Sequence, residues 1–310
     1  MARWLQDIFP ALHSTLNDTC TISSTNLATA IMLASLDIIS PMAFGSNISW
    51  QDHLNLARDL MRKRFPIFRK MHSSSHEDQV CSFLWSWFAY LDVLGSLSGG
   101  PRQNGSHFLL PMDQGDDPDE IDCIMGFTTR CQHLLSETAN LARSSDTARI
   151  RNNSVDTSWR PPTSTIQKAK SLDAALRESL SRQAAPCTHI PSTPSGRNTL
   201  EMAATNEAFH WAALVQLHRR ALGKASSHAD VAEPVRMIMG CLARIRSGTA
   251  EMGMLFPMFT AGCEVADEGA REEVLGRFRN VERNGMTQVC LILFLFPFSP
   301  LLVSLHPRPF

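Results

Sequence analysis

Apolar residues along the first part of the chain recur at the three- and four-residue spacing of α-helices. The spacing predicts a helix over 27–38, followed by Pro41, and a second helix over 50–61 that Pro66 should end. A third predicted helix, 80–94, is apolar on nearly all of its faces. Because a helix of that kind has no face suited to water, we expect it to lie in the centre of the core.

A loop is predicted after the third helix, since Gly95, Gly99, Gly100 and Pro101 follow one another closely. Residues 112–122 then carry six acidic side chains, and an amphipathic helix is expected behind them over 127–141.

From residue 144 to about residue 200 the composition changes to Ser, Thr, Pro, Arg and Asn. We interpret 144–200 as a largely disordered linker that contains one possible isolated helix over 166–182. Strong helical spacing returns over 208–217, 235–243 and 274–281, and the last of these should end at Asn284–Gly285.

Alternation of apolar and polar residues, the pattern of strands, is nearly absent. The predicted fold is therefore all-α, a helical superstructure of roughly ten helices. Its expected parts are a helical half over 1–143, the linker 144–200, a second helical half over 201–288 and an apolar tail over 289–310. The tail is shorter than the roughly 20 apolar residues of a membrane helix, and Pro297 and Pro300 interrupt it. A buried tail and a gene-model artefact, such as translated intron sequence, both remain open, and no membrane contact is expected.

The chain has 29 basic and 30 acidic residues, for a net charge of −1, so it has no overall field that attracts nucleic acid or an anionic membrane. Residues 1–13 lack the apolar core of a secretory signal, which predicts an intracellular protein. The eight cysteines include no pair separated by two residues, as zinc or redox motifs require. We interpret most of them as small buried apolar residues.

No complete catalytic motif is present in the sequence. It lacks a nucleophile elbow, a zinc-peptidase helix and a phosphate-binding loop. The strongest catalytic candidate is an Mg²⁺ site formed by Asp116, Asp117 and Glu120, since clustered carboxylates bind Mg²⁺ in some helical enzymes. Gly115 and Pro118 favour a solvated loop there instead. The prediction is a protein without catalytic, cofactor-binding or metal-binding residues, and not an enzyme.

Three further groups of residues invite a functional interpretation, and each has a simpler structural one. His53 and His210 lie near apolar helical faces without ligand partners and are interpreted as structural. The basic cluster Arg62–Arg64 is too short for a nuclear signal or a nucleic-acid patch and is interpreted as a solvated helix face. A small-molecule effector pocket is conceivable among four aromatic residues, but plain core packing is the favoured interpretation for them: Phe83, Trp87, Phe88 and Trp211.

One segment, Met254–Glu264, has the sequence MLFPMFTAGCE and is followed by Arg271 and by the helix that ends at Asn284–Gly285. It resembles the C-terminal half of the fungus-specific regulatory domain of zinc binuclear-cluster transcription factors. Other segments agree with this family in the same order, from Trp50 through Trp87–Leu94 and on to Trp211–Arg220, so that the resemblance covers about residues 27–289. The group that contains the acriflavine-sensitivity control regulator is similar.

The resemblance implies a helical, non-catalytic regulatory region that tunes activation or repression in the nucleus. In this family a separate module with six cysteines around two zinc ions reads DNA, and no closely spaced cysteine pair precedes Leu27. We therefore expect this polypeptide not to bind DNA specifically by itself. The tail departs from the family too, because the family implies an amphipathic helix with Trp after Val289.

Three functions follow. The first is the regulatory region of a fungal transcription factor for RNA polymerase II, acting on metabolic or secondary-metabolite genes, with the transcription machinery or a zinc-cluster protein as partner. The second is an adaptor or inhibitor that joins an intact regulator without touching DNA. The third is the Mg²⁺-dependent helical enzyme.

Overall fold

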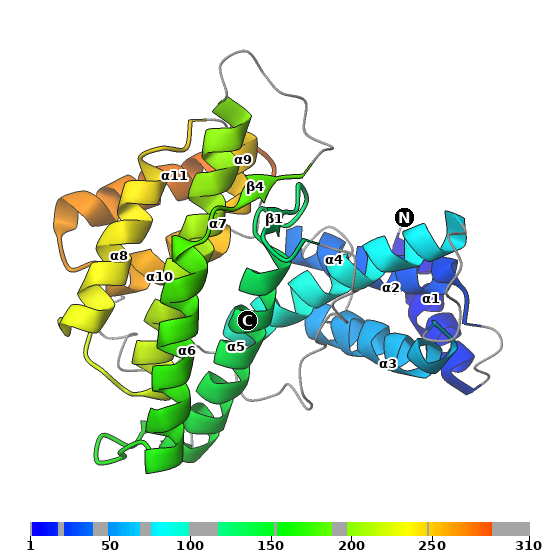
Figure 1. Ribbon diagram of the computed structural model, residues 1–310. Coiled ribbons are helices and arrows are strands. Elements are labelled where there is room, and N and C mark those ends of the chain that lie inside the picture. The colour runs from blue at the N-terminus through cyan, green and yellow to red at the C-terminus, as the bar shows by residue number, and fades with distance from the viewer. Residues whose placement is uncertain are drawn as a thin grey trace. The chain divides into compact units, whose positions relative to one another are not determined.

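The computed structural model describes residues 2–17, 22–39, 49–68, 76–98, 117–151, 154–187, 197–246 and 248–286. These residues contain eleven α-helices and four two-residue strands, which confirms the predicted all-α class (Figure 1). None of the helices in these ranges is long and apolar enough to cross a membrane. The predicted apolar tail, 289–310, lies outside the described residues.

The chain divides into two compact units, which meet in sequence within one helix between Asp92 and Val93. The first unit, called the N-terminal unit below, holds the described helices up to Asp92. The second, called the C-terminal unit, holds the described residues from Val93 to Asn284.

Helices α1, α2 and α3 and the first part of α4 make up the N-terminal unit. Their bounds are Ala2–Ser14 for α1, Thr15–Asn17 for the short 3₁₀ helix η1, Ser24–Ile39 for α2, Trp50–Phe68 for α3 and His76–Ser98 for α4. Helices α2 and α3 pack against each other, and α1 contacts α3. Fully buried apolar side chains such as Ile31, Leu60 and Phe88 form the core, at positions where the helical spacing predicted it.

Two predicted helix ends are wrong. Helix α3 continues past Pro66 to Phe68, and α4 continues past Gly95 to Ser98. Proline removes one N–H and disturbs only the turn before it, so it does not exclude a short continuation near a helix end. Glycine weakens a helix by only about 1 kcal/mol, which packing of neighbouring residues such as Val93 and Leu97, both buried, offsets.

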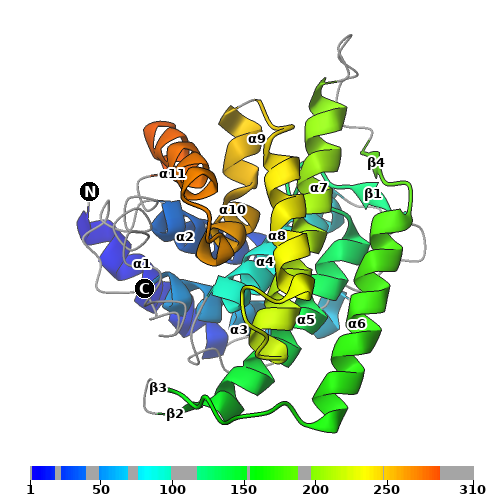
Figure 2. The same ribbon diagram turned by 90° about the vertical axis from the view of Figure 1, so that its left-hand side faces the viewer.

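Helix α7 is the central helix of the C-terminal unit and contacts most of the other helices there. The seven α-helices that lie wholly in this unit are α5 (Thr129–Arg149), α6 (Thr163–Ser181), α7 (Arg197–Gln216), α8 (Ala229–Leu242), α9 (Gly248–Gly253), α10 (Leu255–Glu264) and α11 (Glu268–Arg283). Helix α7 packs against α5, α6, α8 and α10, and Figures 1 and 2 both show α6 beside α5. Small side chains on α7, among them Ala204, Ala208 and Ala212, are completely buried and let its neighbours approach closely.

Residues 144–200, which the composition indicated to be mostly a linker, contain more described structure than a single helix. Helix α5 extends to Arg149, and β2 (Ile150–Arg151) pairs antiparallel with β3 (Ser154–Val155). The possible helix 166–182 is α6, and β4 (Ala185–Pro186) pairs parallel with β1 (Glu120–Ile121). Ser and Thr are tolerated in these helices because their hydroxyls bond to carbonyls within the same turn, as Thr147 does to Arg143 at 2.9 Å. Residues 188–196 lie outside the described residues.

Three helices have no counterpart in the helical spacing of the sequence: α1, α9 and α10. Helix α9 has six residues and α10 has ten, so neither repeats its pattern often enough to be recognised. Helix α11 was expected, and its predicted stop is close to the observed one, since Gly285 adopts φ +106 directly after Asn284.

Candidate functional site

The end of α7 widens into a π-helical turn, η3 (Leu217–Ala221), in which the N–H of Leu222 bonds to the carbonyl of Leu217 at 3.2 Å. A π-turn of this kind often marks a functional position in a helix. Here it directs three consecutive polar side chains to three different helices: His218 contacts α6, Arg219 contacts α10 and Arg220 contacts α5. We call His218, Arg219 and Arg220 with their acidic partners the π-turn network.

Each side chain of the π-turn network has a close acidic partner. His218 Nε2 donates to Asp173 Oδ2 at 2.7 Å, and its Nδ1 accepts from Lys224 Nζ at 3.0 Å. The hydrogen bond from His218 holds the pKa of Asp173 below its usual value.

The two arginines of the π-turn network are mostly buried and form ion pairs. Arg219 Nε lies 2.8 Å from Glu264 Oε2, and Arg220 Nη2 lies 2.7 Å from Asp146 Oδ2. Asp146 also accepts from Arg149 at 2.8 Å. The network therefore fixes α5, α6, α7 and α10 to one another, which is a structural role with every charge partnered.

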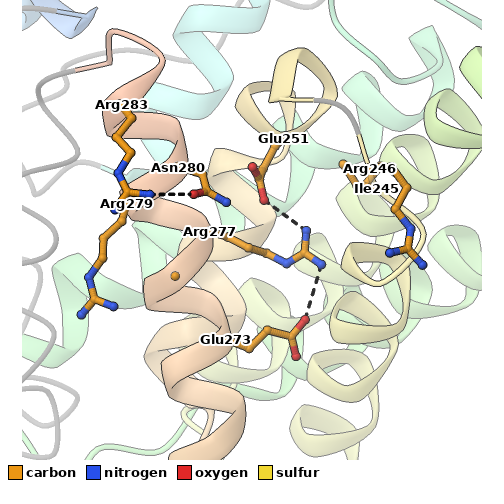
Figure 3. Close-up of a pocket in the computed structure, with 9 residues that line it drawn as sticks. Ile245, Arg246, Glu251, Glu273, Arg277, Arg279, Asn280 and Arg283 are labelled. Carbon is orange, nitrogen blue, oxygen red and sulfur yellow. Dashed lines mark hydrogen bonds and ion pairs between the residues drawn. The ribbon is translucent and has the colours of Figure 1, made fainter.

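A second polar region differs because its charges are not all partnered. An open cavity of about 590 Å³ lies between α9, α11 and the residues after α8 (Figure 3). Its lining contains four arginines and two glutamates: Arg246, Arg277, Arg279, Arg283, Glu251 and Glu273. We call it the arginine cavity.

Arg277 is held in the arginine cavity by two carboxylates. Its Nη1 lies 3.1 Å from Oε1 of Glu251, a buried side chain of α9, and its Nη2 lies 3.5 Å from Oε1 of Glu273, one turn back on α11. Figure 3 shows Arg277 between these two carboxylates, reaching toward the side where Arg246 lies.

The other arginines of the cavity are exposed. Arg279 lies 3.5 Å from Glu272, and Arg283 contacts the amide oxygen of Asn280 at 3.5 Å. The side chain of Arg246 has no hydrogen bond or ion pair among the described residues, while its backbone N–H donates to Glu201 at 2.9 Å. A positively charged cavity suits an anion, because unpaired guanidinium groups bind carboxylate or phosphate oxygens.

The two histidines interpreted as structural are both buried, and burial lowers the pKa of each. His210 Nδ1 lies 2.8 Å from the carbonyl of Asn206, and its Nε2 lies 2.8 Å from Ser179 Oγ, so both ring nitrogens have partners. His53 packs against the ring of Phe9 at 5.2 Å, edge to face.

Two of the three acidic candidates for Mg²⁺, Asp117 and Glu120, belong to the described residues. Asp116 lies outside the described residues, Asp117 accepts the N–H of Asp119 at 2.9 Å, and Glu120 is exposed in β1. Their neighbour Asp119 is instead paired with Arg130 at 2.6 Å, and the hydrogen bond from Arg130 lowers the pKa of Asp119. Among the described residues, no group of three or more His, Cys, Asp or Glu side chains is placed to bind a metal ion.

The aromatic residues proposed for an effector pocket are divided between the units. Phe83, Trp87 and Phe88 belong to the N-terminal unit, where Phe88 is completely buried and the rings of Phe83 and Trp87 lie 5.6 Å apart. Trp211 belongs to the C-terminal unit, and the indole N–H donates to Glu207 at 3.1 Å. None of the four lines the arginine cavity.

The basic cluster and the cysteines can be placed in part. Arg62 lies on the exposed side of α3, 4.0 Å from Asp59, whereas the neighbouring Arg64 bonds to the carbonyl of Ile22 and so fixes α3 to the chain before α2. The described cysteines are free thiols; Cys81, Cys131, Cys187 and Cys241 are buried and Cys123 is exposed.

Sequence reasoning missed both the π-turn network and the arginine cavity. A local signal existed for each. For the network, three consecutive polar residues, His218–Arg220, follow the largely apolar stretch 211–217; for the cavity, Glu273 precedes Arg277 by one turn of α11. Neither signal shows which distant carboxylate or cavity the side chains reach.

The described part of the chain is all-α, with ion pairs between helices and an arginine-lined cavity at the surface of the C-terminal unit. The family model for the fungal specific transcription factor domain matches residues 6–293, and the chain belongs to this family. The resemblance seen in Met254–Glu264 is thereby confirmed. No curated protein and no solved structure matches the chain. Membership of this family supports a regulatory role in transcription.

Proposed function

We propose that the chain is the regulatory region of a fungal transcription factor that acts in the nucleus on transcription by RNA polymerase II and has no enzymatic activity of its own. The observation that carries the proposal is the family match, which spans residues 6–293. Metabolic or secondary-metabolite genes are the proposed targets.

DNA contact is proposed to come from a zinc-cluster partner protein or from another polypeptide segment. This part of the proposal is supported by the cysteine spacing, since no two of the eight cysteines are separated by only two residues. The net charge of −1 supplies no general attraction to the phosphate backbone either.

The test is a reporter assay with the full chain fused to a heterologous DNA-binding domain. The fusion should change reporter transcription relative to the DNA-binding domain alone, in either direction. Two variants provide controls. Ala212→Asp places a charge at a completely buried position of α7 and should abolish the effect, whereas Arg236→Gln on the exposed side of α8 should retain it.

Two results would overturn the proposal: a fusion indistinguishable from the DNA-binding domain alone, or an effect that survives Ala212→Asp unchanged. The adaptor function is distinguished by a second arm with the unfused chain. If the fusion is inactive but the unfused chain lowers the activity of a zinc-cluster regulator with which it co-purifies, the chain is an inhibitor rather than a regulatory region.

A further inference from the structure

The arginine cavity brings together two guanidinium groups that differ in how they are held. Arg277 is half-buried and held by the buried carboxylate of Glu251 at 3.1 Å, so its position is fixed before any ligand arrives. Arg246 lines the same cavity, is exposed, and has no hydrogen bond or ion pair from its side chain among the described residues. A preorganised donor such as Arg277 loses little conformational freedom on binding an anion, and Arg246 has its guanidinium donors available.

Of the two carboxylates beside Arg277, Glu273 is the more exposed and the more distant. Its carboxylate is about half exposed and lies 3.5 Å from Arg277 Nη2, whereas Glu251, at 3.1 Å from Nη1, is almost fully covered. The ion pair between Glu273 and Arg277 contributes little to stability, because it is long and water screens it. A ligand carboxylate or phosphate can therefore displace Glu273 while Glu251 continues to hold Arg277.

We propose that the arginine cavity binds a small organic anion through Arg246 and Arg277, by carboxylate or phosphate oxygens. The cavity volume of about 590 Å³ suits a small metabolite, since ligand pockets measure roughly 300–1,000 Å³. Four arginines face two glutamates in the lining, so the lining carries two more positive than negative charges. Bidentate pairing with oxyanions is the interaction for which guanidinium geometry is best suited.

This inference does not depend on the proposed function. Binding is measured on the purified full chain, without DNA or a reporter, so failure of either proposal is distinguishable from failure of the other.

The experiment combines thermal unfolding with isothermal titration calorimetry at constant ionic strength, adjusted with sodium chloride. The probes form two series: succinate and citrate for carboxylates, and inorganic phosphate and pyrophosphate for phosphates. A ligand that binds only the folded chain raises the unfolding temperature with concentration. One series should do so while matched chloride does not, and the active series identifies which oxyanion the cavity accepts.

Three variants identify the site. Arg246→Gln should weaken binding about tenfold or more, because it removes a charge-assisted hydrogen bond. Glu273→Gln should tighten binding about two- to fivefold, because it removes a competing carboxylate. Arg236→Gln removes an exposed arginine of α8 outside the cavity and should leave the affinity unchanged.

Arg246→Gln should lower the affinity and Glu273→Gln should raise it. A purely structural role of these two residues would not change the affinity in opposite directions. Arg246→Lys keeps the charge without the planar guanidinium and should bind with intermediate affinity. An intermediate value shows that the loss in Arg246→Gln comes from the lost guanidinium and not from a folding defect. The proposal is overturned if neither series binds, if Arg236→Gln weakens binding as much as Arg246→Gln, or if Glu273→Gln weakens it.

Discussion

In the N-terminal unit, Arg58 and Asp92 form an ion pair between α3 and α4 that is buried on both sides, and Lys63 and Arg64 bond to carbonyls before α2. In the C-terminal unit, ion pairs join most of the helices, as in the π-turn network and at Glu251. A single buried ion pair stabilises a unit through one contact, whereas many partly buried pairs divide the stabilisation among several contacts. The two units should therefore respond differently to loss of a carboxylate.

The largest effect is expected for Asp92→Ala. Arg58 is 4% exposed and Asp92 is completely buried, so the variant leaves a buried guanidinium without its carboxylate. The expected loss is about 3–5 kcal/mol of unfolding free energy. Urea unfolding measures it, and hydrogen exchange of α3 and α4 peptides shows whether the loss is confined to the N-terminal unit.

A double variant provides the control. Arg58→Met with Asp92→Leu replaces both charges by apolar groups of similar size and should recover most of the lost stability. If the double variant is as unstable as Asp92→Ala, the loss comes from packing at position 92 and not from the unpaired charge.

The corresponding change in the C-terminal unit, Asp146→Ala, should have a smaller effect of about 2 kcal/mol. Asp146 accepts from Arg149 and Arg220, but both arginines keep some exposure to water, and Arg220 also donates to the carbonyl of Leu97 at 2.8 Å. Urea unfolding of the two single variants in parallel provides the comparison. A loss for Asp146→Ala equal to that for Asp92→Ala would contradict the view that the network distributes its stabilisation.

The same contrast explains which parts of the structure were predictable from sequence. Helices such as α2 and α8 were predicted because their apolar spacing repeats over several turns and their buried residues are those on the predicted face, including Leu27 and Ile238. Short helices give no such repeat, and no helix was predicted for α10, although its sequence LFPMFTAGCE carried the family resemblance.

Side-chain partners far apart in sequence were not predictable. His218 and Asp173 are 45 residues apart, and Arg277 and Glu251 are 26 apart, so nothing in the local sequence relates them. Composition over 144–200 likewise contains no information on tertiary contacts: polar residues of α6 such as Asp173 and Arg177 are partly buried and form ion pairs.

The next prediction concerns the dependence of stability on pH. Here the two units should behave alike, because each contains a buried histidine. Burial lowers the pKa of His210 below its usual value near 6.5, and of His53 likewise, although the charge of Asp52 opposes the shift at His53. As pH falls, the unfolded chain binds a proton at each position before the folded chain does. Stability is therefore present above about pH 6.5 and is lost as pH falls toward the folded pKa, at no more than about 1.4 kcal/mol per pH unit for each group.

Unfolding free energies measured from pH 7.5 to pH 5 test this prediction. His210→Gln should flatten the dependence of the C-terminal unit, and the same substitution at exposed His133 of α5 is the matched control, because it leaves His210 in place. A wild-type stability that does not fall over this range, or a slope unaffected by His210→Gln, would show that these histidines do not remain neutral in the folded chain.

The smallest effect is expected for Arg279→Gln, and its neighbour on α11 provides the contrast. Arg279 is about half exposed and lies 3.5 Å from Glu272, which is more exposed still, so the loss should stay below about 0.5 kcal/mol. Arg277→Gln, two residues earlier, leaves the buried Glu251 without its guanidinium and should cost about 2 kcal/mol. Thermal and urea unfolding of the two variants measure the difference. Equal losses would mean that burial of the carboxylate does not set the strength of these ion pairs, and the contrast between the two units would then need another cause.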